Sequence, residues 1–292
     1  MKKFPFALAL HGGAGAVRRK DYGREIAHMR GLVETARDAL ARGTKALDVA
    51  VETVAALEAS GLYVAGRGAS PNLAGRYELD ACLMNGADGR AGAVAALQGF
   101  ASPIAVARAV MEKTPHVMLV GEGATTFARD QGFAEIDDPD GFFTQAGKGE
   151  HNHPPGVLAH GTVGCVVRDA DGNLAAATST AGVFQKLPGR VGDTPVIGAG
   201  TFADRNVAVS CTGQGEYFIR VAAAAQIAFR CQFLGQTLTE STQAVLDAVG
   251  KLGGDGGLIA IDAAGDLAAP FLGEGMKRAM FTREGEILSD AF

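Results

Sequence analysis

Apolar and polar positions near the start of the chain follow two different periods. Residues 4–10 form a short, nearly continuous apolar run that ends at His11-Gly12-Gly13. Apolar residues then recur between Arg24 and Arg42, and again from Leu47 to Leu57, at the spacing that one face of an amphipathic helix requires. The pattern predicts a buried first strand followed by two adjacent helices.

The middle of the chain carries shorter segments. Strand-like runs lie at 78–84, 92–97 and 116–120, and Ser102-Pro103 opens a helical pattern that extends to about Lys113. From 135 to 160 the sequence turns to loop composition, and an unstructured stretch of about 25 residues is longer than a compact domain usually contains. We expect a flexible linker over about 135–161.

Strands return after this linker. Residues 162–169 and 174–180 flank the turn signal Asp169-Ala170-Asp171-Gly172-Asn173 and predict a β-hairpin. The later elements are a strand, a long Ala-rich helix, a second helix and a closing hairpin, at 207–212, Gly215 to about Phe233, 238–249, and 258–261 with 267–271. Because helices and strands come in blocks, the order favours a layered α/β (α+β) fold, with packed sheets and helices outside, over a doubly wound parallel sheet.

Composition and charge limit the class of protein. The 292 residues are 47% apolar and 20% charged, which suits a single large domain over 1–292. The net charge of −5 gives no attraction to nucleic acid, and no apolar run approaches the roughly 18 residues of a membrane span. The N-terminal run lacks a secretory cleavage site, and the four cysteines are widely separated. We expect buried thiols in a reducing cytoplasm.

No cofactor motif is complete. Asp169-x-Asp171-x-Asn173 begins like a calcium loop but continues with Leu174 where glycine is required. The glycine pairs that begin at Gly13 and Gly66 do not extend to a dinucleotide fingerprint. The sequence therefore predicts no cofactor for catalysis.

Thr162 is the candidate nucleophile. Gly161-Thr162 closes the turn-rich stretch, and Thr162 opens the apolar run Val163–Val167. If the chain cut itself after Gly161, the new α-amine, with a reference pKa of about 7.7, would lie beside its own hydroxyl. One residue would then supply both base and nucleophile. The plainer reading of Gly-Thr, taken alone, is the start of a strand.

Further motifs decide between these readings. They are His11-Gly12-Gly13-Ala14-Gly15, Ala65-Gly66-Arg67-Gly68, Thr178-Ser179-Thr180-Ala181-Gly182, Gly189-Arg190-Val191-Gly192-Asp193, Thr212-Gly213-Gln214-Gly215 and Gly253-Gly254-Asp255-Gly256-Gly257. With Thr162 they make the chain, through nearly its whole length, resemble the plant-type asparaginase and isoaspartyl peptidase family of N-terminal nucleophile hydrolases. The resemblance implies an αββα sandwich of two stacked, mainly antiparallel sheets flanked by helices. It also implies autocleavage into an α subunit, 1–161, and a β subunit, 162–292.

The resemblance assigns roles to individual residues. Thr162 is the nucleophile freed by cleavage after Gly161, and Thr180 hydrogen-bonds around it. The Thr212 hydroxyl and the Gly213 N–H form the oxyanion hole, and Arg190 and Asp193 clamp the α-carboxylate and α-ammonium of an aspartyl group. Gly213 and Gly215 contribute backbone to the substrate site. The implied activity is hydrolysis of β-aspartyl (isoaspartyl) dipeptides and of L-asparagine through an acyl-enzyme.

The resemblance also implies a structural sodium ion and a dimer of αβ units. The sodium ligands would be main-chain carbonyls of Leu57, Glu58, Ser60, Tyr63, Ala65 and Arg67. Two departures from the family pattern lie near the site: Val64 stands where asparagine is usual, and Gln214 replaces a small threonine. We therefore expect free asparagine to be a poorer substrate than β-aspartyl dipeptides.

Two other functions remain open. An aspartylglucosaminidase-like amidase shares the nucleophile and the clamp and differs mainly in the width of its pocket. A catalytically silent binding protein for a small molecule would never be processed. Denaturing electrophoresis distinguishes the second of these from an enzyme, because only an enzyme runs as two fragments.

Overall fold

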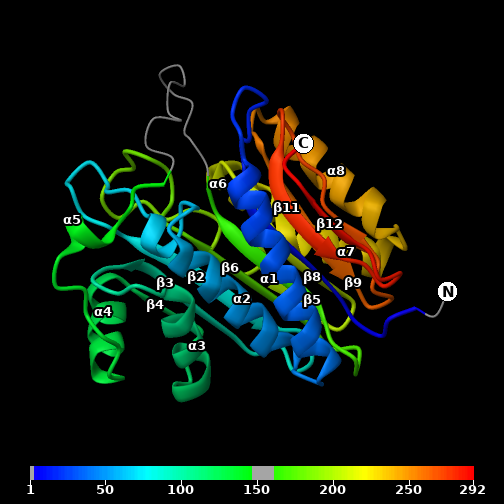
Figure 1. Ribbon diagram of the computed structural model, residues 1–292, viewed down its shortest axis with the longest axis horizontal. Helices are drawn as coiled ribbons and strands as arrows, with labels where there is room; N and C mark the ends of the chain where they lie inside the picture. Colours follow the sequence, from blue (N-terminus) through cyan, green and yellow to red (C-terminus); the bar gives the residue numbers. More distant parts are fainter. Residues whose placement is uncertain (1–2, 147–160) are drawn as a thin grey trace.

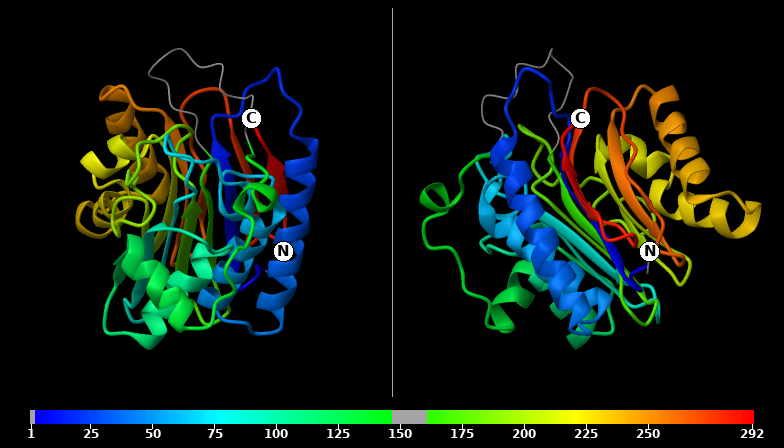
Figure 2. Two further views of the ribbon diagram at one scale, coloured as in Figure 1. Left: turned by 90° about the vertical axis from the view of Figure 1, so that its left-hand side faces the viewer. Right: turned by 45° about the vertical axis from the view of Figure 1, so that its right-hand side comes forward.

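Two β-sheets stacked face to face form the centre of the molecule, and helices cover the outer side of each (Figure 1, Figure 2). The computed structural model describes residues 3–146 and 161–292. Most of the expected linker, residues 147–160, lies outside the described part of the chain. The layered, mainly antiparallel architecture predicted from the order of the elements is confirmed.

The larger sheet runs from an edge near the C-terminus to an edge in the first half of the chain. Its strands are β1 (Ala7–Ala14), β2 (Leu79–Asn85), β3 (Ala91–Leu97), β4 (Met118–Val120), β5 (Val163–Arg168), β6 (Leu174–Thr180), β11 (Met276–Phe281) and β12 (Ile287–Asp290). Their order is β12-β11-β1-β5-β6-β2-β3-β4, and only the β3–β4 pair is parallel. The smaller sheet has the order β10-β9-β8-β7 and comprises β7 (Thr201–Ala203), β8 (Val207–Gly213), β9 (Gly256–Asp262) and β10 (Leu267–Ala268).

The helices divide between the two outer faces. On the larger sheet lie α1 (Gly23–Ala41), α2 (Ala46–Ser60), α3 (Pro103–Lys113) and α4 (Gly121–Asp130). The 3-10 turn η1 (Gly66–Gly68) follows α2, and the short helix α5 (Pro139–Phe142) follows α4. On the smaller sheet lie α6 (Gly215–Arg220), α7 (Ala223–Leu234) and α8 (Leu238–Lys251). The predicted first strand and the two helices after it are confirmed.

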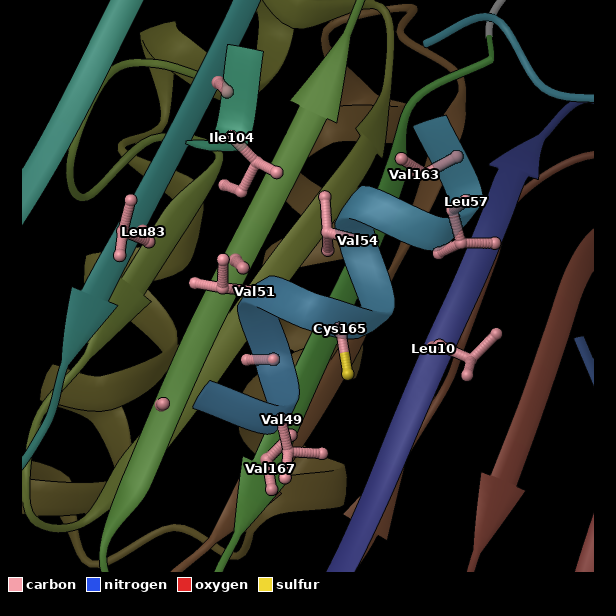
Figure 3. Packing of buried hydrophobic residues seen from close by; sticks show 14 of the residues in the cluster. Leu10, Val49, Val51, Val54, Leu57, Leu83, Ile104, Val163, Cys165 and Val167 are labelled. Carbon is pink, nitrogen blue, oxygen red and sulfur yellow. The ribbon is translucent and has the colours of Figure 1, made fainter. Parts of the chain in front are cut away.

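Strand β5 shows how the strands can be apolar on both faces. Val163, Cys165 and Val167 point to the helices, where α2 packs across them (Figure 3). Val166 points the other way and packs between the sheets with small residues such as Ala9. Side chains alternate along a strand, so a strand buried on both sides reads as a continuous apolar run. Each large aliphatic side chain buried in this way contributes about 1.5–3 kcal/mol.

The prediction of one helix from Gly215 to about Phe233 is wrong. Helix α6 ends at Arg220, and Val221 and Ala222 separate it from α7; the φ of Ala222, 47°, is left-handed. The first N–H groups of α7 find partners outside the helix, because Ala224 N donates to Ala199 O and Ala225 N to Gly198 O. These hydrogen bonds pair N–H groups that would otherwise lack a partner at the break. No glycine or proline at 221–222 marks the break in the sequence.

The sequence also failed to predict α4, β7, β11 and β12, and it placed α5 (Pro139–Phe142) inside the expected flexible linker. Strand β11 carries Lys277 and Arg278 in the middle of its apolar residues, which hides the strand pattern. The cysteines are free; Cys82, Cys165 and Cys211 are buried and Cys231 is partly buried. No helix within residues 3–146 and 161–292 is long and apolar enough to span a bilayer.

Candidate active site

The β5–β6 hairpin brings Thr162 and Thr180 together. Thr162 directly precedes β5, Thr180 ends β6, and the register pairs Val163 with Ser179. Thr162 Oγ donates a hydrogen bond to Thr180 Oγ over 3.2 Å, and Thr180 Oγ also accepts from Gly182 N at 3.0 Å. Both threonines are buried. The pairing expected from the sequence is thus present as a hydrogen bond.

The peptide group before Thr162 is closely packed on both sides. A Cβ on Gly13, which has a φ of +99°, would lie 2.9 Å from Gly161 Cα. A Cβ on Gly161 would lie 2.4 Å from Cγ2 of Val64. Glycine is therefore required at 13 and at 161, and Val64 forms an apolar wall against the Gly161–Thr162 junction.

A buried histidine holds the carbonyl group of Thr162. His11 on β1 lies with Nδ1 3.1 Å from Thr162 O and Nε2 2.9 Å from Ser210 Oγ. Burial lowers the pKa of His11 to about 3, so the imidazole is neutral. A carbonyl can only accept, so Nδ1 carries the proton and Nε2 accepts from Ser210.

Hydroxyl groups continue this chain of hydrogen bonds between the two sheets. Ser210 Oγ on β8 lies 2.8 Å from Thr178 Oγ on β6, and Thr201 Oγ on β7 donates to Thr178 Oγ at 2.7 Å. Thr201 Oγ is also 3.0 Å from Thr194 O, beside the loop that carries the predicted clamp. The motifs that contain His11 and Thr178 mark two members of this network in the sequence, but the hydrogen bonds that join them to Ser210 and Thr201 were not predicted.

Thr212 and Gly213 lie at the end of β8, as expected for an oxyanion hole. Gly213 lines a small pocket together with Thr162 and Thr180. Thr212 is fully buried behind it, and its Oγ accepts a hydrogen bond from Ala14 N at 3.2 Å. That acceptance leaves the hydroxyl proton of Thr212 free to be donated.

The same pocket contains both predicted clamp residues. Its lining is Gly161, Thr162, Thr180, Gly182, Val183, Arg190, Gly192, Asp193, Thr194 and Gly213. Gly215 is not among them but lies behind the clamp, because a Cβ on it would come 2.7 Å from Asp193 Oδ1. The sequence reasoning missed Gly182, Val183, Gly192 and Thr194.

Two polar atoms of the pocket have no hydrogen-bond partner among the described residues. They are Asp193 Oδ2 and Thr194 Oγ1, both buried. Desolvation raises the pKa of Asp193 to about 6, and the charge of Arg190 opposes this shift. Buried polar atoms are rarely left unpaired, so these two mark a place for a ligand that donates hydrogen bonds.

The segment proposed for sodium is tightly curled. A Cβ on Gly66 would lie 2.8 Å from Glu58 O, and one on Gly68 would lie 1.8 Å from Tyr63 O. Tyr63 O accepts from Ala65 N, and Ala65 O accepts from Gly68 N. Tyr63 O and Ala65 O each keep a second lone pair for a further partner, whereas Arg67 O accepts from both Thr144 N and Thr144 Oγ. Within the described residues no group of three His, Cys, Asp or Glu side chains suits a metal.

Stacked, mainly antiparallel sheets between helices, with a threonine at the start of a central strand, define an N-terminal nucleophile hydrolase.

A family model described as asparaginase matches residues 4–150 and 144–288. Isoaspartyl peptidase of Salmonella typhimurium is 46% identical over 294 residues, covering 93% of this chain and 94% of the relative. Isoaspartyl peptidase of Escherichia coli is 45% identical, covering 93% and 91%. Plant-type L-asparaginase of Thermococcus kodakarensis is 41% identical, covering 89% and 91%. The chain therefore belongs to the asparaginase family, as the resemblance predicted.

Proposed function

We propose that this protein is a self-processing threonine amidohydrolase that cleaves β-aspartyl dipeptides and L-asparagine. The names of its relatives, isoaspartyl peptidase and plant-type L-asparaginase, support this activity. The observation that carries it is one pocket that holds Thr162, hydrogen-bonded to Thr180, together with Arg190 and Asp193. A nucleophile and a pair of opposite charges suit a substrate with a free aspartyl end.

Autocleavage creates the catalyst. Thr162 Oγ attacks the carbonyl carbon of Gly161, the peptide nitrogen leaves as the α-amine of Thr162, and water hydrolyses the resulting ester. The products are the α subunit, 1–161, and the β subunit, 162–292. The new amine then lies beside its own Oγ and can take the proton of that hydroxyl.

Substrate hydrolysis repeats the same chemistry on a new carbonyl. Thr162 Oγ attacks the side-chain carbonyl of the aspartyl group, and the Thr212 hydroxyl and Gly213 N–H stabilise the oxyanion, each worth on the order of a hundredfold in rate. The leaving amine takes the proton from the Thr162 ammonium. Water then attacks the acyl-enzyme and releases aspartate.

The charges of the pocket select the substrate. Arg190 binds the α-carboxylate, and Asp193 together with Thr194 receives the α-ammonium, which can donate to the two unpartnered oxygens. The apolar Val64, packed against Gly161, offers no hydrogen bond to a small amide leaving group. β-Aspartyl dipeptides are therefore the better substrates.

Assays of the purified protein test this function. The kcat/KM values for a β-aspartyl dipeptide, L-asparagine and a glycosylated asparagine should fall in that order. Equal kcat/KM values for the dipeptide and L-asparagine would remove the proposed preference. Turnover of the glycosylated substrate alone would point to an aspartylglucosaminidase-like amidase, and no turnover of any of them to a binding protein.

We also propose a sodium site, a dimer and a cytoplasmic location for this protein. Carbonyl groups of Leu57, Glu58, Ser60, Tyr63, Ala65 and Arg67 would hold a structural sodium ion and so stiffen the loop beside Val64. The mature enzyme would pair two αβ units and act in the cytoplasm. Analytical ultracentrifugation of the processed protein tests the assembly.

A further inference from the structure

A carboxylate that has no assigned role holds Arg190. Glu216, on the first turn of α6, accepts from Arg190 Nε at 2.9 Å through Oε1 and from Nη2 at 2.9 Å through Oε2. Two parallel bonds between a guanidinium and a carboxylate form the most directional ion pair available to side chains. Glu216 therefore fixes the plane of the guanidinium as well as its position.

The remaining nitrogen of Arg190 lies beside two glycines of the pocket. A Cβ on Gly182 would be 3.3 Å from Nη1, and a Cβ on Gly192 would be 2.9 Å from it. Both glycines line the pocket that holds Thr162. Glu216 uses the Nε–H and one N–H of Nη2, so both N–H groups of Nη1 and the second N–H of Nη2 remain to donate at the pocket wall.

Arg190 needs such a partner because of where it lies in the chain. It is carried by the loop between β6 and β7, which contains no helix or strand. A long side chain on a loop samples many rotamers, and ordering it during binding would weaken the affinity for substrate. The ion pair with Glu216 orders the guanidinium before the substrate arrives.

We propose that Glu216 is a positioning residue of the substrate site, which turns Arg190 so that Nη1 meets the α-carboxylate of the substrate. This inference rests on the proposed function. Glu216 acts through Arg190, and the side of the guanidinium that it occupies is unavailable to the substrate. Its effect falls on binding, and the chemical step at Thr162 does not depend on it.

The variant Glu216→Gln tests this role. The amide keeps the size of the side chain but loses the charge and one acceptor oxygen, so KM for a β-aspartyl dipeptide should rise about tenfold with kcat within about twofold. The inhibition constant of L-aspartate, which carries the same α-carboxylate, should rise by the same factor. The matched control is Glu135→Gln, which breaks a second two-bond Arg–Glu pair, at 2.6 and 3.1 Å to Arg129, outside the pocket. It should leave both constants unchanged.

A double variant keeps the test informative if Glu216→Gln also lowers stability. Lysine cannot form the two-bond pair, so Arg190→Lys already loses the positioning, and adding Glu216→Gln to it should raise KM by less than about twofold. An unchanged KM in Glu216→Gln overturns the inference. A lower KM also overturns it, because Glu216 would then compete with the substrate. Absence of wild-type turnover would instead remove the proposed function itself.

Discussion

The two sides of the pocket differ in how completely their polar groups are paired. On the nucleophile side, the Thr162 carbonyl, His11, Ser210 and Thr178 form a buried chain in which each polar atom has a partner. On the clamp side, Asp193 Oδ2 and Thr194 Oγ1 are buried and have no partner among the described residues. The nucleophile side is thus complete without a ligand, whereas the clamp side requires one.

This difference separates catalysis from recognition. A paired, buried network resists movement and fixes the reacting hydroxyl, which favours the chemical step. Unpaired buried atoms raise the free energy of the unliganded site and gain hydrogen bonds when a substrate enters. Changes on the first side should therefore lower kcat, and changes on the second should raise KM.

Thr162→Ala should have the largest effect on the nucleophile side. Without the hydroxyl there is no autocleavage and no acyl-enzyme, so kcat should fall by on the order of 10⁴-fold or more. On denaturing electrophoresis the variant should run as one chain. Thr162→Ser, which keeps a hydroxyl, should still yield two fragments, and efficient turnover by Thr162→Ala would disprove the assignment.

Asp193→Asn should have the largest effect on the clamp side. The substitution keeps the shape of the side chain but removes the charge that meets the α-ammonium, so KM should rise about 30-fold or more with a small change in kcat. Steady-state kinetics with a β-aspartyl dipeptide measures this change. Asp247→Asn, on the exposed side of α8, is the control. A kcat loss without a KM change would contradict the division of roles.

Ser210→Ala should affect the nucleophile side more mildly. It removes the donor to His11 Nε2, which leaves a buried nitrogen unpaired at a cost of about 1–3 kcal/mol in stability, and lets the Thr162 carbonyl shift. We expect kcat to fall about 10- to 100-fold and KM to stay constant. Ser241→Ala removes another buried hydroxyl, away from the pocket, and should lower the melting temperature without changing kcat. If both variants keep full kcat, the network has no role in catalysis.

Low pH should weaken the binding of L-aspartate, because Asp193 on the clamp side becomes protonated. The pKa of Asp193 is raised to about 6, so its carboxylate becomes protonated as the pH falls below that value and no longer attracts an ammonium group. The inhibition constant of L-aspartate should therefore rise about tenfold between pH 7 and pH 5. Asp193→Asn should lose this dependence, and a flat profile in the wild type would contradict the role of Asp193.

Of the changes considered, the addition of sodium ions should have the smallest effect, and that effect should be on stability. The proposed ion, held by carbonyls between α2 and η1, would stabilise the fold by mass action, so replacing choline chloride with sodium chloride should raise the melting temperature by about 2–4 °C. The inhibition constant of L-aspartate should change little, because none of the proposed sodium ligands lines the pocket. The same melting temperature in both salts would argue against a sodium site.

The sequence predicted local structure where short-range chemistry determines it. The turn at 169–173 gives the β5–β6 hairpin, and the helices α1, α2 and α3 follow from their apolar faces. The break at Ala222 and the strands β11 and β12 depend on hydrogen bonds to residues elsewhere in the fold, so they cannot be predicted from their local sequence. The same holds for the site: Thr201 and Ser210 are register partners on β7 and β8, and only the stacking of the two sheets brings Thr178 on β6 to them.

N-terminal sequencing of the active, purified protein is the most direct test of the central claim that Thr162 becomes a chain terminus. The account predicts two chains, the second of which begins Thr162-Val163-Gly164-Cys165. Activity from material that contains only the uncut chain of 292 residues would contradict it.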